Sequence, residues 1–537
     1  MAPTIRLFYG TFIDLPRTKP SPSAKHALSI RHGALWVSPL TGRILGADWT
    51  LPSESHLPYL ITKNGWSPSE VQICIACEAH NEFFFPGFID THIHAPQYPN
   101  SGLFGSSTLL HWLENYTFPL EASMSDIQRA RVVYSTVIDR TLANGTTFAS
   151  YFATTHVPAT NLLADLAFIR GQRALIGRVC MDNPDFCPDY YKDESAEDSL
   201  LKTREVISHI HSLDPEGKLV KPILTPRFAP TCSHPALEGL GSLANEYSPP
   251  LHIQTHISEN VDEVALVSSL FPESESYADV YDKHNLLTEK MILAHAVHLT
   301  AAEKKLIATR GSKIAHCPAS NSALGSGLAP VRDLLDHGIT VGLGTDVSGG
   351  YSSSILEAVR GGCLVSRLLR HSTAEISAGP AAKEKEEGRE VLSVEESLYL
   401  ATRGGAAVVG MEEELGGFEE GMFWDVQLVR LDSGVSLPFA KIQSQSLAGK
   451  GTVDIFGWES WVEKVHKWVW TGDDRNVRKV WVRGALVHEV ENPSESSGLS
   501  VQNVLGNVFC KGWTKWAAGG LGVAAAGIIL GKRGRVF

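Results

Sequence analysis

The sequence predicts an α/β protein, a (β/α)8 barrel of the TIM type with a second, small, β-sandwich-like domain built from both ends of the chain. Three observations carry this prediction. Eight short apolar runs rich in β-branched residues occur in the middle of the chain, the segments between them leave room for helices, and both ends have a strand-like texture. Parallel strands need crossover connections and are covered on both faces, so such an alternation favours a closed barrel.

The predicted domain boundaries follow this change of texture along the 537 residues. Residues 1–85 and 412–490 are expected to form the small β domain, residues 86–411 the metal-dependent barrel, and residues 491–537 a flexible C-terminal tail. Short strands broken by turn residues are expected near both ends, at 5–9, 27–30, 34–37, 44–45, 425–429 and 479–487. The polar residues 378–390 are expected to form a surface loop.

The eight runs expected as barrel strands are 83–94, 146–151, 174–180, 222–225, 251–256, 292–295, 313–317 and 341–345. Helix-start signals lie between some of these runs. Residues 125–128 and 300–303 have the pattern of capping boxes and open segments that stop at Gly145 and Gly311, and residues 393–396 open a third helix.

Composition limits the classes of partner. The formal net charge is −12 without a dense Lys/Arg stripe, which argues against nucleic acid and favours a small neutral molecule. The eight cysteines are scattered through a chain that has no secretory signal at its start, so we expect free thiols and a reducing, cytosolic location. The apolar stretch 516–530 has fifteen residues, fewer than the ~20 that span a bilayer, so we expect at most a weak membrane anchor, or else a packed or flexible tail.

Histidines and an aspartate lie at the same end of several predicted barrel strands. His92 and His94 close the first run two residues apart, so their side chains share one face. His256 closes the fifth run, His295 closes the sixth, and Asp346 follows the eighth. Because the carboxyl ends of barrel strands form the active-site rim, we expect these side chains to meet in one small space.

These residue types suit a single divalent metal ion with water at an open coordination position, as is typical of catalytic sites. The expected ligands are His92, His94, His256 and Asp346. Nitrogen and oxygen ligands with one open position favour Zn²⁺, one per subunit. Such a cation lowers the pKa of bound water from ~15.7 towards ~7, which makes hydroxide available at neutral pH. The fourth run ends at Arg227 without a lysine that could bridge a second metal.

Three residues are expected to be catalytic. Glu259, just beyond His256, is close to the predicted metal without having to bind it, and it can carry a proton from the water to the substrate and on to the leaving group. His295 and Asp346 are placed to hydrogen-bond the attacking water and orient it.

Several segments carry a resemblance to a known family. The run 86–94, the segment 256–259, His295 at a strand end and the segment 344–346 together resemble the amidohydrolase superfamily, in which a mononuclear subgroup deaminates purines, pyrimidines and triazines. Six further segments are similar to the guanine-deaminating members of that superfamily, at 94–98, 112–119, 179–182, 225–228, 348–351 and 472–476. The resemblance extends to about residue 490, and neither the loop 378–390 nor the tail has a counterpart in it.

The resemblance implies hydrolysis of guanine to xanthine and ammonia in purine catabolism by a homodimer. In that reading Glu259 protonates the ring nitrogen beside the reacting carbon, Arg227 addresses the purine carbonyl, Gln97 donates and accepts at a purine edge, and Phe228 stacks on or walls the ring. His256 completes the expected substrate contacts.

Other readings of these residues stay open. Arg227 could form a rim salt bridge, Gln97 could stabilise a loop, and Phe228 could belong to the core. His316, at the end of the seventh run, is expected to form a rim hydrogen bond or to contact substrate.

Rival functions are a deaminase or dechlorinase for an adenine-type, thioadenosine-type or triazine substrate, and a scaffold of the same fold without metal. An arginine that can donate to a purine carbonyl argues against the first rival. An intact set of metal ligands argues against the second. A cytidine-type zinc deaminase is excluded, because the sequence lacks Pro-Cys-x-x-Cys although residues 80–82 match His-x-Glu.

Overall fold

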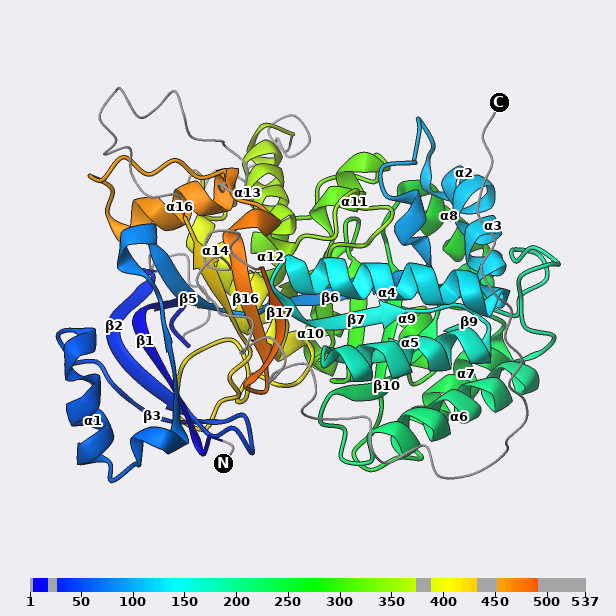
Figure 1. The fold of residues 1–537 in the computed structure, drawn as a ribbon. Helices are drawn as coiled ribbons and strands as arrows, with labels where there is room; N and C mark the ends of the chain where they lie inside the picture. Colours follow the sequence, from blue (N-terminus) through cyan, green and yellow to red (C-terminus); the bar gives the residue numbers. More distant parts are fainter. Residues whose placement is uncertain (1–2, 18–26, 373–387, 432–451, 491–537) are drawn as a thin grey trace, which may run out of the picture. The chain divides into compact units, whose positions relative to one another are not determined.

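The structure is a computed structural model that describes residues 3–17, 27–372, 388–431 and 452–490. These residues belong to one compact unit, Met1–Val490, which contains two sheets (Figure 1). The predicted tail 491–537 with its apolar stretch 516–530, and residues 378–387 of the predicted loop, lie outside the described residues. Within the described ranges, no helix combines the length and apolar character needed to cross a bilayer.

The larger sheet confirms the predicted barrel. Its eight main strands are parallel and follow one another around the barrel in chain order. They are β6 (Phe88–His94), β7 (Thr146–Phe152), β8 (Arg173–Gly177), β10 (Val220–Pro226), β11 (His252–Ile257), β12 (Met291–His295), β13 (Lys313–His316) and β14 (Val341–Leu343). The short strand β9 (Val179–Cys180) continues β8 and pairs with β10.

Helices connect the strands and cover the outside of the barrel, as α4, α5 and α6 show in Figure 1. The helices after the first barrel strands are α4 (Ile127–Ala143), α5 (Val157–Arg170), α6 (Ala196–Leu213), α7 (His234–Ala244), α8 (Val261–Leu270) and α9 (Tyr277–Lys283). Those that follow are α10 (Ala301–Arg310), α11 (Pro318–Ala323), α12 (Val331–Asp336), α13 (Ile355–Ser372), α14 (Val394–Tyr399) and α15 (Gly405–Val408).

The helix starts agree with two of the three predicted signals. Capping boxes begin α10 at Thr300 and α14 at Ser393, as predicted. The capping box expected at 125–128 is wrong, because the N-cap of α4 is Asp126, whose carboxylate accepts hydrogen bonds from the backbone N–H groups of Gln128 and Arg129.

The first and last barrel strands are joined at their carboxyl ends. The Asp346 N–H donates to the His92 carbonyl oxygen (2.8 Å), and the His94 N–H donates to the Val347 carbonyl oxygen (3.1 Å). These bonds close the barrel between β6 and the segment after β14, and they bring residues more than 250 positions apart into contact.

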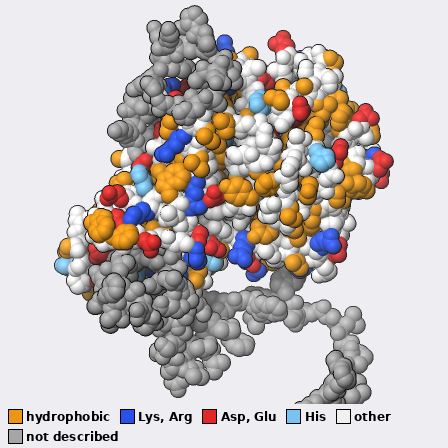
Figure 2. All heavy atoms as spheres, turned by 90° about the horizontal axis from the view of Figure 1, so that it is seen from above, with side chains coloured by type: hydrophobic (Ala, Val, Ile, Leu, Met, Phe, Trp, Pro, Cys, Tyr) orange, Lys and Arg blue, Asp and Glu red, His pale blue; other side chains and the backbone are white. Residues whose placement is uncertain are grey.

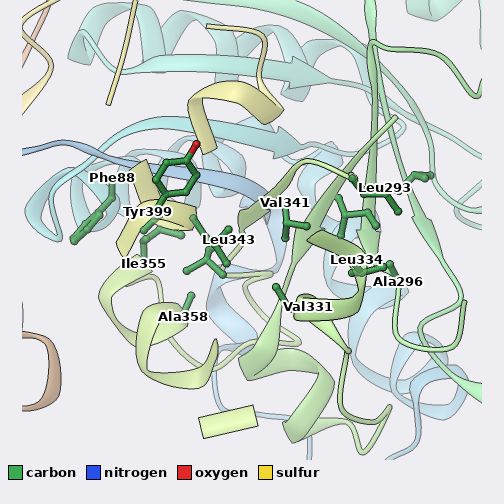
Figure 3. Close-up of a cluster of buried hydrophobic side chains, with 14 of the residues drawn as sticks. Phe88, Leu293, Ala296, Val331, Leu334, Val341, Leu343, Ile355, Ala358 and Tyr399 are labelled. Carbon is green, nitrogen blue, oxygen red and sulfur yellow. The ribbon is translucent and has the colours of Figure 1, made fainter. Parts of the chain in front are cut away.

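A large hydrophobic cluster packs the helices against the last strands. Figure 3 shows Leu343 of β14 beside Ile355 of α13, with Tyr399 of α14 next to them and Val341 of β14 on the other side of Leu343. All four side chains are buried. Burial of an aliphatic or aromatic side chain of this size stabilises the fold by roughly 1.5–3 kcal/mol. This packing holds the end of β14, from which Asp346 follows, in a fixed position.

The second sheet is mixed and takes its strands from both ends of the described unit, as predicted. Its order is β17-β16-β15-β5-β1-β2-β3, with β4 paired to β1. The strands are β1 (Ile5–Asp14), β2 (Ser29–Val37), β3 (Ile44–Asp48), β4 (Val71–Ile75), β5 (Glu82–Pro86), β15 (Val426–Arg430), β16 (Val477–Val482) and β17 (Ala485–Glu489). Helices α1 (Leu57–Lys63) and α16 (Trp461–Thr471) accompany this sheet. The exact domain boundaries at 85/86 and 411/412 stay predictions.

The run 83–94, expected as one strand, is divided between the two sheets at Gly87. Residues before it pair with β15 and β1 in the mixed sheet, and residues after it pair with β7 in the barrel. A Cβ atom at Gly87 would lie 2.3 Å from the Thr147 side chain, so the chain can pass here only without a side chain. The division was not visible in the sequence because the residues on both sides are apolar and buried.

Candidate active site

The predicted metal ligands converge at the carboxyl ends of the barrel strands. His92 and His94 end β6, His256 lies one residue before the end of β11, and Asp346 follows β14. Their ligand atoms all lie within 4.8 Å of one another. The structure therefore brings together four side chains from three separate segments of the chain.

The distances between these atoms are short and similar. The Asp346 Oδ1 atom lies 3.1 Å from His92 Nε2 and 3.3 Å from His94 Nε2. The His94 Nε2 atom lies 3.2 Å from both His92 Nε2 and His256 Nε2. Neighbouring ligands of one zinc ion at the usual zinc–nitrogen distance of ~2.0–2.1 Å are separated from one another by about 3–4 Å, so this spacing fits one central cation.

The protonation states also suit a cation. The His256 Nδ1–H donates to the Arg227 carbonyl oxygen (2.6 Å), which leaves the Nε2 lone pair directed at the other ligand atoms. Burial lowers the pKa of His94 to about 4 and lowers the pKa of His92 and His256, so the imidazoles are neutral. Converging lone pairs and a carboxylate without a proton repel one another unless a positive charge lies between them. This group of residues suits a divalent metal.

Asp346 remains ionised in this buried site. Burial alone would raise the pKa of its carboxyl group, but the close contacts with His92 and His94 lower the pKa well below its usual range. Its backbone φ of 47° is positive, as is the φ of 74° at His295. Such conformations are uncommon for residues other than glycine and occur often at functional sites.

Glu259 lies beside this group in an environment that suits proton transfer. Its Oε2 atom is 3.4 Å from His295 Nε2, and its Oε1 atom accepts a hydrogen bond from Ser326 Oγ (2.8 Å). Burial, together with the charge of Asp346, raises the pKa of Glu259 to about 8, although the Ser326 hydroxyl opposes this rise. A carboxyl group with such a pKa can both take up and release a proton near neutral pH.

His295 has a defined orientation. Its Nδ1–H donates to Asn321 Oδ1 (2.8 Å), so its Nε2 atom is directed towards Glu259 and lies 3.8 Å from Asp346 Oδ2. The three residues predicted to be catalytic are therefore adjacent to one another.

A cavity opens onto these groups. The side chains of Glu259, His295 and Asp346 are part of its lining. Its other walls are largely apolar, and are formed by Leu109, Trp112, Leu113, Phe228 and Leu324. A cavity with apolar walls and a few convergent polar groups is typical of a site for a small molecule.

The predicted substrate-contact residues line the same cavity. Gln97 and Arg227 are buried in its wall, and Phe228 contacts it with its ring edge-on to His256 at 6.4 Å between ring centres. Arg227 does form a salt bridge, with NH1 2.6 Å from Glu121 Oε2, but the pair is buried rather than at the rim.

The expected hydrogen bond of His316 is not formed. Its side chain is buried, and neither ring nitrogen has a partner among the residues that the structure describes. Burial lowers the pKa of His316 to about 3, so the ring is neutral. It is not among the residues that line the cavity.

Sequence reasoning missed four buried residues that hold this site, namely Glu121, Glu263, Asn321 and Ser326. Glu263 could have been found, because Asn260 and Glu263 form the capping box of α8, in which the Glu263 carboxylate accepts from the backbone N–H groups of Glu259 (2.8 Å) and Asn260. The other three act through contacts with residues far away in the chain, for which the sequence contains no pattern.

Comparison with known proteins places the chain in a family. Residues 83–487 match the model of the amidohydrolase family. The chain is 50% identical over 410 residues to a probable guanine deaminase of Schizosaccharomyces pombe, covering 76% of this chain and 72% of that protein. It is 39% identical over 490 residues to the guanine deaminase of Homo sapiens, covering 91% and 97% respectively.

A solved structure agrees with these matches. The guanine deaminase of C. acetobutylicum with bound guanine superposes with a TM-score of 0.72 at 31% identity, covering 90% of this chain and all of that one. The similarity thus covers nearly the whole described unit, including the barrel, the converging histidines and the buried Glu259. This chain belongs to the amidohydrolase family, in the branch formed by the guanine deaminases.

Proposed function

We propose that this chain hydrolyses guanine to xanthine and ammonia at the cavity described above, in purine catabolism. The observation that carries the proposal is the convergence of a metal-ligand group and a proton-carrying carboxyl group at a cavity that Gln97 and Arg227 also line. Family membership, and the bound guanine in the C. acetobutylicum relative, support guanine as the substrate.

The residues that would hold the metal are His92, His94, His256 and Asp346. Zinc is the proposed ion, because three neutral imidazoles and one carboxylate match the nitrogen and oxygen ligands that it prefers. When bound, such an ion supplies Lewis acidity and lowers the pKa of a water molecule at the open position.

Glu259 moves the protons of the reaction. Its carboxylate takes a proton from the attacking water and delivers it to the ring nitrogen beside the reacting carbon of guanine. Glu259 then takes a second proton from the hydroxyl group now on that carbon and passes it to the departing amino group. The C–N bond breaks, the new carbonyl of xanthine forms and ammonia leaves. His295 Nε2, held through its Nδ1–H by Asn321, and the second carboxylate oxygen of Asp346 orient the water.

The remaining lining residues hold the purine. Arg227 donates to the purine carbonyl oxygen, Gln97 donates and accepts along the ring edge, and Phe228 walls the ring. The apolar walls exclude bulk water, which strengthens these hydrogen bonds. A site that hydrogen-bonds the substrate discriminates strongly against analogues that lack the matching groups.

A substrate panel tests the proposal. Purified protein is offered guanine, adenine, 2-aminopurine and a triazine, and release of ammonia is followed. Guanine is expected to be deaminated with the highest kcat/KM, and a higher value for adenine or the triazine would overturn the proposal in favour of a different deaminase.

A cytosolic homodimer is also part of the proposal, on the strength of the family resemblance. On the face shown in Figure 2, Lys and Arg side chains are interspersed with Asp and Glu, and the net charge of the chain is −12, which supports a small-molecule partner over nucleic acid. Light scattering on the full-length protein would test the dimer.

A further inference from the structure

Glu121 is a buried carboxylate that the proposed reaction does not use. It lies on α3 (Phe118–Ala122), directly after a wide π-type turn at Leu113–Thr117. Its side chain has an exposed fraction of 0%. Turns of the π type are rare and frequently accompany functional sites. This one directly precedes the short helix that carries Glu121.

Both carboxylate oxygens of Glu121 are fully used within the protein. Oε1 accepts from Gln97 Nε2 (2.7 Å) and Arg227 NH2 (3.2 Å), and Oε2 accepts from Arg227 NH1 (2.6 Å) and the Tyr191 hydroxyl (2.8 Å). A carboxylate has about four acceptor positions, so these four bonds leave Glu121 without capacity for a ligand. Glu121 therefore orients other side chains and does not bind the substrate.

Glu121 fixes the amide of Gln97. One Nε2–H of Gln97 donates to Glu121, and Gln97 Oε1 accepts from the backbone N–H of Ser348 (3.2 Å). An acceptor on one side and a donor on the other define which end of the amide is nitrogen and which is oxygen. Gln97 retains one N–H and one acceptor position, both with a set orientation, for a molecule in the cavity.

Glu121 also fixes the guanidinium group of Arg227. The two parallel hydrogen bonds define the plane of the fork, and the Phe118 ring lies 5.0 Å from Arg227 Cζ. Although burial alone would raise the pKa of Glu121, Arg227 lowers it, so the carboxylate stays ionised. The buried pair has no net charge, and the cavity wall therefore offers directed donors for a neutral ring carbonyl rather than an attraction for anions.

We propose that Glu121 is a positioning residue that holds Gln97 and Arg227 as one rigid recognition surface and so sets the preference for a purine that carries the ring carbonyl. This inference rests on the proposed function, because it concerns how the same cavity selects its substrate. Glu121 itself touches neither the substrate nor the reacting atoms.

The test compares two substrates in Glu121→Gln. This substitution keeps the volume of the side chain but replaces one acceptor oxygen by an NH2 group that faces the donors of Arg227 or Gln97. For guanine we expect KM to rise about tenfold or more with kcat changed less than about threefold, because recognition is lost rather than chemistry. For 2-aminopurine, which keeps the reacting amino group but lacks the carbonyl, we expect KM to change less than about threefold.

Two further variants complete the design. Tyr191→Phe removes the one contact of Glu121 that does not involve a cavity-lining residue, and both substrates should stay within about threefold of wild type. Glu121→Asp keeps the charge and shortens the side chain, and it carries the same two-substrate comparison if Glu121→Gln is not recovered folded. Metal content per chain and the melting temperature are measured on every variant.

The outcomes separate the inference from the proposed function. Wild-type protein that releases no ammonia from guanine contradicts the proposed function and the inference with it. Wild-type protein that is active, with variants of Glu121 that lose guanine and 2-aminopurine turnover equally or lose neither, overturns the inference alone. A fall in selectivity for guanine, at unchanged metal content, supports it.

Discussion

Replacement of Ser326 by alanine should move the acidic limb of the pH–rate profile to higher pH. Ser326 Oγ donates a 2.8 Å hydrogen bond to Glu259 Oε1 and lowers the pKa of this carboxyl group, which burial raises to about 8. The hydrogen bond stabilises the ionised form, so its loss raises the pKa further. The ionised form takes the proton from water, and the variant therefore needs a higher pH to reach the same fraction of active enzyme.

The size of the shift follows from the strength of the hydrogen bond. A hydrogen bond to a charged group contributes ~1.5–3 kcal/mol, and one pKa unit corresponds to ~1.4 kcal/mol. Loss of the Ser326 hydroxyl should thus raise the pKa of Glu259 by about 1 to 2 units and lower kcat/KM about 10- to 100-fold on the acidic limb. A bound cation moves the limb of both proteins in the same direction, so the difference between them is the quantity to measure.

The assay is kcat/KM for guanine between pH 5 and 10 in Ser326→Ala and wild type. Ser322→Ala is the matched control, because the Ser322 hydroxyl donates to the Pro318 carbonyl oxygen (2.8 Å) and its loss should leave the profile unchanged. An acidic limb that stays in place in Ser326→Ala would show that Glu259 is not the group that titrates there.

Three further outcomes are expected. Glu259→Gln should lower kcat about 10²- to 10⁴-fold while the metal content per chain, measured by mass spectrometry, stays the same, and wild-type turnover in this variant would exclude the proton-transfer role. Removal of metal by a chelator should abolish turnover and lower the melting temperature. An ion at a free concentration about 1,000 times its dissociation constant stabilises the folded state by ~4 kcal/mol. Scanning fluorimetry that detects no shift of the melting temperature would count against a bound ion. Gly87→Ala should lower the free energy of unfolding, measured in urea, by about 1–3 kcal/mol, because its Cβ would lie 2.3 Å from the Thr147 side chain. Gly362→Ala within α13 is the control. The nearest atom to its Cβ would be 3.6 Å away, so this substitution should be neutral or stabilising.

Much of the barrel was predictable because each strand is buried on both faces. Such strands appear in the sequence as continuous apolar runs, and a parallel barrel places their carboxyl ends at one rim. This is why His92, His94 and Asp346 could be assigned to one site although more than 250 positions separate the histidines from the aspartate. The strand ends were accurate to a few residues, which is enough to place a side chain at the rim.

The parts that the sequence did not reveal depend on contacts between residues far apart in the chain. Glu121 lies on a helix of five residues, and its partners Gln97, Tyr191 and Arg227 are 24, 70 and 106 positions away. No periodic pattern marks such a residue, and only the folded chain shows that its carboxylate is surrounded by donors. The division at Gly87 escaped notice for a related reason, because burial in either sheet requires the same apolar residues.

Titration of metal-free protein with Zn²⁺, while conversion of guanine to xanthine is followed, tests the one-metal hydrolase most directly. Activity should rise from zero in proportion to added metal and reach its plateau at one equivalent per chain. Full turnover before any metal is added, or a plateau at two equivalents, would contradict a single ion held by the three histidines and Asp346.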